Sequence, residues 1–229
     1  MDALLSSDFV SSLYDNLIYA GRMRMLLRGL LMTLQISAGA VVLGVTVGLV
    51  IAFFKMSGVK FLKLIADAYI DVIRGTPAVT QLLIINFTIF ASVRGAGLWV
   101  GIVAMGINSG AYVAEIIRAG VLSIDVGQTE AGRSLGFSRF DTMRYIVMPQ
   151  AIKNILPALC NEFIVLIKET AIVGYIAVED LTKMGQIIVS RTLSTIPLFA
   201  TAILYFIIIK ILTYFFRILE KRLRASDAR

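Results

Sequence analysis

The stretch LLRGLLMTLQISAGAVVLGVTVGLVIAFF, residues 26–54, contains one charged side chain, Arg28. A helix rises about 1.5 Å per residue and the hydrocarbon of a bilayer is about 30 Å thick, so about 20 apolar residues can cross it. The stretch is therefore predicted to be a membrane-spanning helix. Gly39, Gly44 and Gly48 lie within it, and small residues let a second membrane helix approach closely.

The composition of the whole chain agrees with a membrane protein. Of its 229 residues, 58% are hydrophobic and 16% are charged, whereas a soluble domain is about 45–50% apolar and about 25% charged. These values exclude a water-soluble enzyme, a secreted disulfide scaffold and a disordered chain. Cys160 is the only cysteine and the chain has no histidine, so an intrachain disulfide, a histidine metal site and a Ser–His triad are excluded. We expect no catalytic residue and no metal site.

Four further apolar runs follow, at residues 61–90, 98–118, 155–178 and 196–219. We predict an all-α, polytopic transmembrane bundle of about five spans that forms a single domain over residues 1–229. Arg74, Gly75, Thr76 and Pro77 interrupt the second run, and each half alone is too short to cross. We interpret the run as one kinked span, with these four residues at the kink and as a candidate gate.

The chain ends and the basic residues predict an orientation. Leu5, Phe9, Leu13 and Leu17 are spaced four apart, which predicts an amphipathic interfacial helix within residues 1–24. The net charge of +7 comes from Lys and Arg that mostly lie between and after the apolar runs, a pattern typical of cytoplasmic loops rather than of a nucleic-acid-binding surface. We expect a multi-pass protein of the cell membrane, surrounded by lipid, with its N-terminus outside and its C-terminus in the cytoplasm.

The loop over residues 127–150, between the third and fourth runs, carries the most specific pattern. It contains Glu130-Ala131-Gly132, then Gly136 after three residues, and Ile146-Val147-Met148-Pro149 after nine more. This pattern resembles the EAA loop of the membrane-spanning permease subunits of ABC importers, with Gly132 replacing an alanine and Met148 a leucine. Gly136 is expected to end a first short helix in a left-handed conformation, residues 137–145 to form a second, and Pro149 to keep Met148 out of the α conformation. The alternative is an ordinary amphipathic loop.

The resemblance implies how the chain works with its partners. Two ATP-binding cassette ATPase subunits would dock on the loop, with the following residues as coupling positions: Glu130, Ala131, Gly132, Ser134, Leu135, Gly136 and Phe137. The other implied partners are a second permease chain, identical or similar, and an extracytoplasmic amino acid-binding protein. ATP and Mg would lie on the ATPase, so we expect no cofactor in this chain, which also lacks a Gly-x-x-x-x-Gly-Lys-Ser/Thr phosphate loop.

Residues 69–77, 107–120 and 149–158 extend the resemblance to the polar amino acid subfamily, and within it to permeases for arginine, histidine, lysine and glutamine. The implied activity is import of a polar amino acid into the cytoplasm by a non-catalytic subunit. Two other classes remain as alternatives, an ion-coupled transporter or channel and an intramembrane enzyme.

Polar side chains inside the spans are the candidate substrate site, because buried polar groups in membranes are costly. Asn108 and Ser109 are predicted to hold the amino acid backbone at a locally opened turn, although hydrogen bonding between helices is an equal alternative. Tyr112 would line the cavity, and Asn161 and Glu162 would face the substrate side chain.

Charge spacing completes these expectations. Glu162 has no basic residue three or four positions away, so a cationic substrate would be its natural partner. We therefore expect arginine, lysine or histidine as the substrate, with glutamine as the alternative. Asp71 and Arg74, like Glu115 and Arg118, are three residues apart, a spacing that favours ion pairs within one helix.

Overall fold

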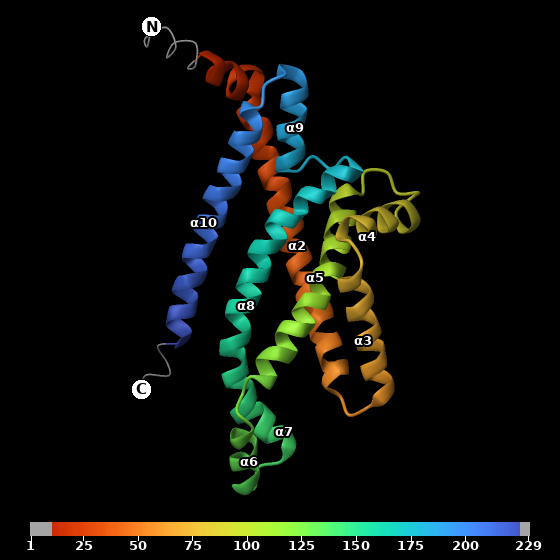
Figure 1. Cartoon of the computed structure of the whole chain (residues 1–229), viewed down its shortest axis with the longest axis vertical. Coiled ribbons are helices and arrows are strands. Elements are labelled where there is room, and N and C mark those ends of the chain that lie inside the picture. Colours follow the sequence, from red (N-terminus) through yellow and green to blue (C-terminus); the bar gives the residue numbers. More distant parts are fainter. Residues whose placement is uncertain (1–10, 225–229) are drawn as a thin grey trace.

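The computed structural model describes residues 11–224, and all of the regular elements among them are helical (Figure 1). Residues 11–17 form a short helix of about two turns that precedes the labelled elements. In chain order these elements are η1 (Tyr19–Gly21), α2 (Arg22–Met56), α3 (Lys60–Gly75), α4 (Ala78–Ile84), η2 (Ile85–Ile89), α5 (Gly97–Leu122), α6 (Val126–Ser134), α7 (Arg139–Thr142), η3 (Met143–Val147), α8 (Met148–Glu169), η4 (Thr170–Ile176), α9 (Leu181–Thr192) and α10 (Ile196–Arg224).

The pairing of α2 with α5 forms the centre of the molecule (Figure 1). A Cβ atom at Gly48 would lie 2.5 Å from Cγ1 of Val113, and one at Gly44 would lie 3.1 Å from Cβ of Ser109. On α5, a Cβ atom at Gly106 would lie 2.7 Å from Cδ2 of Leu43. Each helix therefore places side chains over glycines of the other, as we predicted for the glycines of α2.

Gly39 completes this seam, because a Cβ atom there would lie 2.7 Å from Cδ1 of Ile102 on α5. Membrane helices associate through close packing, since the surrounding lipid is as apolar as their own side chains. The backbones of α2 and α5 can approach this closely only where no Cβ atom stands between them.

The break between α3 and α4 lies where the sequence predicts it. Helix α3 ends at Gly75, Thr76 is extended with φ −122° and ψ 149°, and α4 begins directly after Pro77. Pro77 restricts Thr76 to the extended region, which ends α3. The bend between Lys60–Gly75 and Ala78–Ile89 is 105°, so α4 runs across the molecule while α3 runs along it (Figure 1). The expected kink in one span is therefore a sharp turn.

The predicted set of five spans is met only in part. Among the described residues, three helices are long and apolar enough to cross a membrane, and a fourth is added if the bent pair counts as one span. Helix α8 is not in this set, because polar and charged residues interrupt it. The run predicted over residues 155–178 is also divided differently, since α8 ends at Glu169, η4 follows, and Ala177 is left-handed with φ 60°.

The N-terminal segment is described only from residue 11. Residues 11–17 are helical, and Ala20 and Gly21, with φ 55° and φ 72°, interrupt the helix before α2 begins. Leu5 and Phe9 lie outside the described residues, so the interfacial helix within residues 1–24 stays a prediction.

The seam predicts a large effect of Gly48→Ile. The added Cβ would lie 2.5 Å from Val113 and 3.0 Å from the carbonyl oxygen of Gly110, and the second contact is to backbone that cannot rotate away. Overpacking of this kind costs about 1–3 kcal/mol. We expect a lower melting temperature and less monodisperse protein after detergent extraction. Gly58→Ile is the control, because no heavy atom lies within 4 Å of a Cβ there; equal melting temperatures for the two variants would contradict the role of the seam.

Candidate functional site

Two neighbouring polar residues lie buried in the middle of α5. Asn108 and Ser109 are 4% and 1% exposed, and Ser109 Oγ donates a hydrogen bond of 2.9 Å to Oε1 of Glu162 on α8. The structure thus brings Ser109 and Glu162 together across two helices. The predicted opened turn is wrong, because α5 is one continuous helix over Gly97–Leu122. Its backbone groups at this turn bond within the helix, and the carbonyl oxygen of Ile107 also accepts a hydrogen bond from the Tyr69 hydroxyl, so only side chains are left for a substrate.

Asn108 bonds to the break between α3 and α4 through Gln81. Asn108 Nδ2 donates to Gln81 Oε1 at 3.1 Å. Gln81 Nε2 donates in turn to Ile73 O and Thr76 Oγ1, both at 2.8 Å, and to Thr76 O at 3.2 Å. Gln81 was not among the predicted site residues. Its signal in the sequence was an amide four residues after Pro77 in a mostly apolar run.

The other side chains of the break lie near the same face of α5. The guanidinium of Arg74 lies over the ring of Tyr112, 5.2 Å from its centroid. The predicted ion pair of Asp71 with Arg74 is absent from the ion pairs that the described residues form. At Gly75, no heavy atom would lie within 4 Å of an added Cβ atom, so the structure leaves room for a side chain at this position.

Asn161 does not join Glu162, although the sequence analysis grouped the two. Asn161 is exposed and lines a hollow of about 180 Å³ between α8 and α10, together with Arg217 and Glu220. Successive residues of a helix point about 100° apart, so Glu162 can face α5 while Asn161 faces α10.

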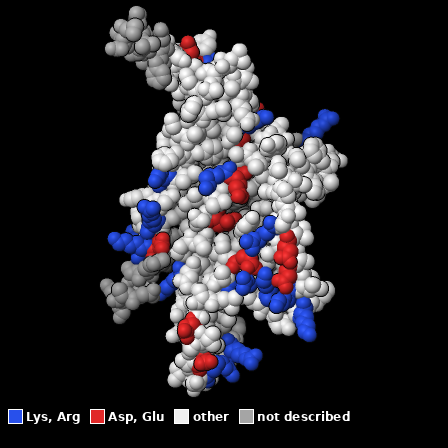
Figure 2. Space-filling view, viewed as in Figure 1, with Lys and Arg blue, Asp and Glu red and all other residues white. Residues whose placement is uncertain are grey.

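A four-residue ion-pair network joins α2, α3 and α5. Lys55 Nζ lies 3.2 Å from Asp67 Oδ1 and 2.7 Å from Glu115 Oε1, and Arg118 Nη2 lies 2.8 Å from Glu115 Oε2. The predicted pair of Glu115 with Arg118 is confirmed. Figure 2 shows that charged side chains are sparse over the upper part of the molecule and gather over its middle and lower parts.

The loop over residues 127–150 folds as two short helices. Asp125 caps α6 by accepting a hydrogen bond of 2.7 Å from Gly127 N. Gly136 is left-handed with φ 89°, as predicted, and its N–H donates to Arg133 O at 3.1 Å. Phe137 N donates to Gly132 O at 3.2 Å, which completes the two backbone bonds of a Schellman motif.

The second half of the loop departs from the prediction at Pro149. Met148 is α-helical, with φ −63° and ψ −41°, whereas Pro149 was expected to exclude that conformation. The π-helix η3 (Met143–Val147) precedes it. A π-turn bonds residues five apart, so the chain is wide enough at this point to accept the proline ring without ending the helix.

Gly132 is buried inside the loop, and its lack of a side chain has a steric reason. A Cβ atom there would lie 2.6 Å from Cδ1 of Ile146 and 3.0 Å from Cγ2 of Thr142. The remaining coupling positions are on the outside: Glu130, Ala131, Ser134, Leu135, Gly136 and Phe137. Helices α6 and α7 lie at one end of the molecule (Figure 1). Leu135 and Phe140 in this loop are 77% and 70% exposed, so apolar side chains face outward there.

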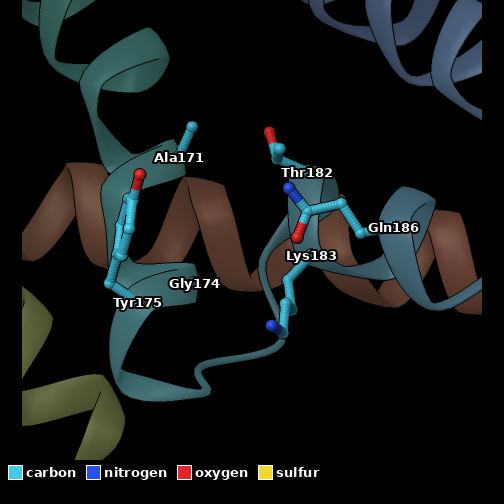
Figure 3. A pocket seen from close by; sticks show the side chains of 6 residues that line it. All are labelled: Ala171, Gly174, Tyr175, Thr182, Lys183 and Gln186. Carbon is cyan, nitrogen blue, oxygen red and sulfur yellow. The ribbon is translucent and has the colours of Figure 1, made fainter.

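The hollows that we describe lie away from Asn108, Ser109, Tyr112 and Glu162. One of about 380 Å³ lies between η4 and α9, where Tyr175 stands opposite Thr182 and Gln186 (Figure 3). None of the five hollows that we describe is lined by Asn108, Ser109, Tyr112 or Glu162. None of these five hollows therefore marks the predicted substrate site.

Long apolar helices, polar bonds between them and two projecting short helices together define a membrane transport subunit. Residues 44–225 match the family model described as "Binding-protein-dependent transport system inner membrane component", and the chain belongs to that family. It is 39% identical over 204 residues to the glutamine transport system permease protein GlnP of Escherichia coli (strain K12), covering 87% of this chain and 93% of the relative.

Solved structures give the same assignment. A crystal structure of an amino acid ABC transporter with histidines matches with a TM-score of 0.82 and 47% identity, covering 87% of this chain and 94% of that one. An inward-facing MetNI methionine ABC transporter matches with a TM-score of 0.76 at 20% identity, which shows the shared fold. The chain is therefore a non-catalytic permease subunit of an ABC amino acid importer, and a multi-pass inner-membrane protein. The two alternative classes, an ion-coupled transporter and an intramembrane enzyme, are excluded.

The ion-pair network predicts different effects of two substitutions on α3. Asp67→Asn removes the charge that pairs with Lys55. Because Asp67 is 37% exposed and Lys55 keeps its pair with Glu115, the change should cost about 0.5–1 kcal/mol. Asp71→Asn, one turn along the same helix, removes a carboxylate without an ion pair in the described structure and should cost less than about 0.5 kcal/mol. Melting temperatures in detergent measure the difference. A melting temperature for Asp67→Asn that equals that of Asp71→Asn would contradict the network.

Proposed function

We propose that this permease imports a basic amino acid and that Glu162 binds the cationic end of the substrate. The proposal rests on the surroundings of the Glu162 carboxylate. It is only partly exposed between α5 and α8, it accepts a hydrogen bond from Ser109, and no Lys or Arg among the described residues forms an ion pair with it. A carboxylate near the bilayer centre costs about 2.5 kcal/mol or more, and a guanidinium or ammonium group of the substrate would offset that cost.

Neighbouring side chains provide the remaining contacts of the proposed site. Asn108 and Ser109 contact the backbone end of the substrate, and Tyr112 forms its side. Arg74 lies over Tyr112, one helical turn along α5 from Asn108, and supplies a positive charge for the substrate carboxylate. Gly75, Thr76 and Pro77 hold Arg74 at the break, which acts as the gate.

Glutamine is the second candidate substrate. The name of the Escherichia coli relative, which is 39% identical, supports it. The side-chain amide of glutamine also donates hydrogen bonds to a carboxylate, but it carries no charge to balance Glu162.

The proposed partners bind at the two ends of the molecule and beside it in the membrane. Two ATPase subunits bind the α6–α7 loop of two permease chains in the cytoplasm, and they hold the ATP and Mg. A second permease chain, identical or similar, pairs with this one in the membrane. An extracytoplasmic amino acid-binding protein delivers the substrate to the opposite end, the N-terminus lies outside and the C-terminus lies in the cytoplasm.

Glu162→Gln tests the proposed substrate. The change keeps the size and the bond with Ser109 but removes the charge, so uptake of arginine or lysine into proteoliposomes should fall at least about tenfold, or about 1.4 kcal/mol. Uptake of glutamine, where present, should be unchanged. The control is Glu169→Gln, an exposed carboxylate two turns along α8, which should preserve uptake. Equal losses for all substrates would show that Glu162 has a structural role instead.

Gly136→Val tests the proposed coupling loop. Valine at φ 89° costs roughly 1–2 kcal/mol and disturbs the turn between α6 and α7. We expect the variant to insert into the membrane but to retain less ATPase on co-purification and to lose substrate-stimulated ATP hydrolysis.

Gly95→Val is the matched control. Gly95 has φ 73°, and like Gly136 it has no heavy atom within 4 Å of a Cβ, but it lies before α5 at the other end of the molecule. It should retain the ATPase. If both variants lose the ATPase equally, backbone strain rather than the docking loop explains the loss.

A further inference from the structure

The hydrogen bonds of Gln81 determine which way its amide points. Nε2 lies 2.8 Å from the backbone oxygen of Ile73 and 3.2 Å from that of Thr76. A backbone carbonyl oxygen only accepts hydrogen bonds, so the amide nitrogen of Gln81 must face the break. The amide oxygen must then face α5.

The same reasoning fixes the amide of Asn108. Because Gln81 presents an oxygen at 3.1 Å, Asn108 must direct its amide nitrogen toward it. Oδ1 of Asn108 has no hydrogen-bond partner among the described residues, and it is not one of the fully enclosed side-chain oxygens that lack one. Oδ1 of Asn108 is therefore available as an acceptor. The amide cannot flip to present Nδ2 there, because Nδ2 is bonded to Gln81.

Glu162 presents acceptors next to this position. The hydroxyl hydrogen of Ser109 is used in the bond to Oε1 of Glu162, which leaves the other carboxylate oxygen available. At Asn108 and Ser109, the atoms available to a ligand are therefore hydrogen-bond acceptors. They are Oδ1 of Asn108 and the second carboxylate oxygen of Glu162, the partner of Ser109. A surface of acceptors binds groups that donate hydrogen bonds.

We propose that Gln81 is a positioning residue that makes Asn108 bind the α-ammonium group of the amino acid through Oδ1. This inference rests on the proposed substrate site and deepens it by naming the substrate group that Asn108 recognises. The substrate carboxylate then points away from Asn108, toward the side on which Arg74 lies over Tyr112. Without Gln81 the Asn108 amide can rotate, and an amide that rotates offers a donor as readily as an acceptor.

The experiment compares ligands with and without the α-amino group. The permease–ATPase complex is placed in nanodiscs without the binding protein, and equilibrium dialysis measures the binding of arginine and of 5-guanidinopentanoate, which is arginine without that group. Glutamine and its deaminated analogue, 4-carbamoylbutanoate, form a second pair. We expect the wild-type complex to prefer the amino acid in at least one pair by tenfold or more.

Two variants at one position separate orientation from stability. Gln81→Met removes both ends of the amide and should reduce the preference at least fivefold, through weaker binding of the amino acid. Gln81→Glu keeps an oxygen that accepts from Asn108 and should retain the preference. Thr88→Val is the control, because the Thr88 hydroxyl bonds only to Ile84 of the same helical segment.

Each other result counts against part of the proposal. An unchanged preference in Gln81→Met would overturn the role of Gln81, and an equal loss in Gln81→Met and Gln81→Glu would show that Gln81 only stabilises the break. If the wild-type complex binds the amino acids but does not prefer them to their analogues, the recognition of the ammonium group is wrong while the proposed site stands. If neither amino acid binds to the wild-type complex, the proposed site is overturned together with this inference.

Discussion

The close packing of α2 on α5 is the constraint on which the other features depend. Glycines on each helix receive side chains of the other, and the two backbones approach where lipid offers no hydrophobic drive for association. The site is part of this seam, because Gly44 leaves room for Ser109, whose Cβ would lie 3.1 Å from a Cβ at position 44. Ser109 is therefore held against α2 on one side and bonded to Glu162 on the other. The position of the hydroxyl that bonds the candidate carboxylate thus follows from the absence of a side chain on a different helix.

The break between α3 and α4 is attached to this centre at two places. Gln81 bonds the backbone of the break to Asn108, and Arg74 lies over Tyr112. A helix that ends inside a membrane protein must find partners for its last carbonyl groups, and here a side-chain amide serves two of them. The Gln81 amide thus bonds both the carbonyl groups of the break and the side chain of Asn108. A change in the angle between α3 and α4 would therefore move the group that orients Asn108.

The sequence predicted those features that depend on residues close together along the chain. The turn at Gly136, the pair of Glu115 with Arg118 and the break before Pro77 each follow from local conformation or from helical spacing, and each is present. The contributions of Lys55, Asp67 and Gln81 were missed, because their partners come from other helices and no periodicity within one helix indicates them. The same limit explains why Asn161 was placed beside Glu162, since only the packing of α5 and α10 shows which helix each one faces. The prediction of an opened turn at Asn108 failed for a different reason. Ser109 and Gly110 are poor helix formers, but the packing of α5 against α2 outweighs their preference.

The π-helix η3 determines the direction in which the side chains of α8 point. An α-helix turns by about 100° per residue, so one residue fewer in this wide turn would rotate α8 by that amount and direct Glu162 away from Ser109. The segment that precedes Pro149 belongs to the loop that contains α6 and α7, while Glu162 lies nearly four turns further along the same helix. A small twist of the loop would therefore rotate the Glu162 side chain about the axis of α8. It would not shift Glu162 along that axis.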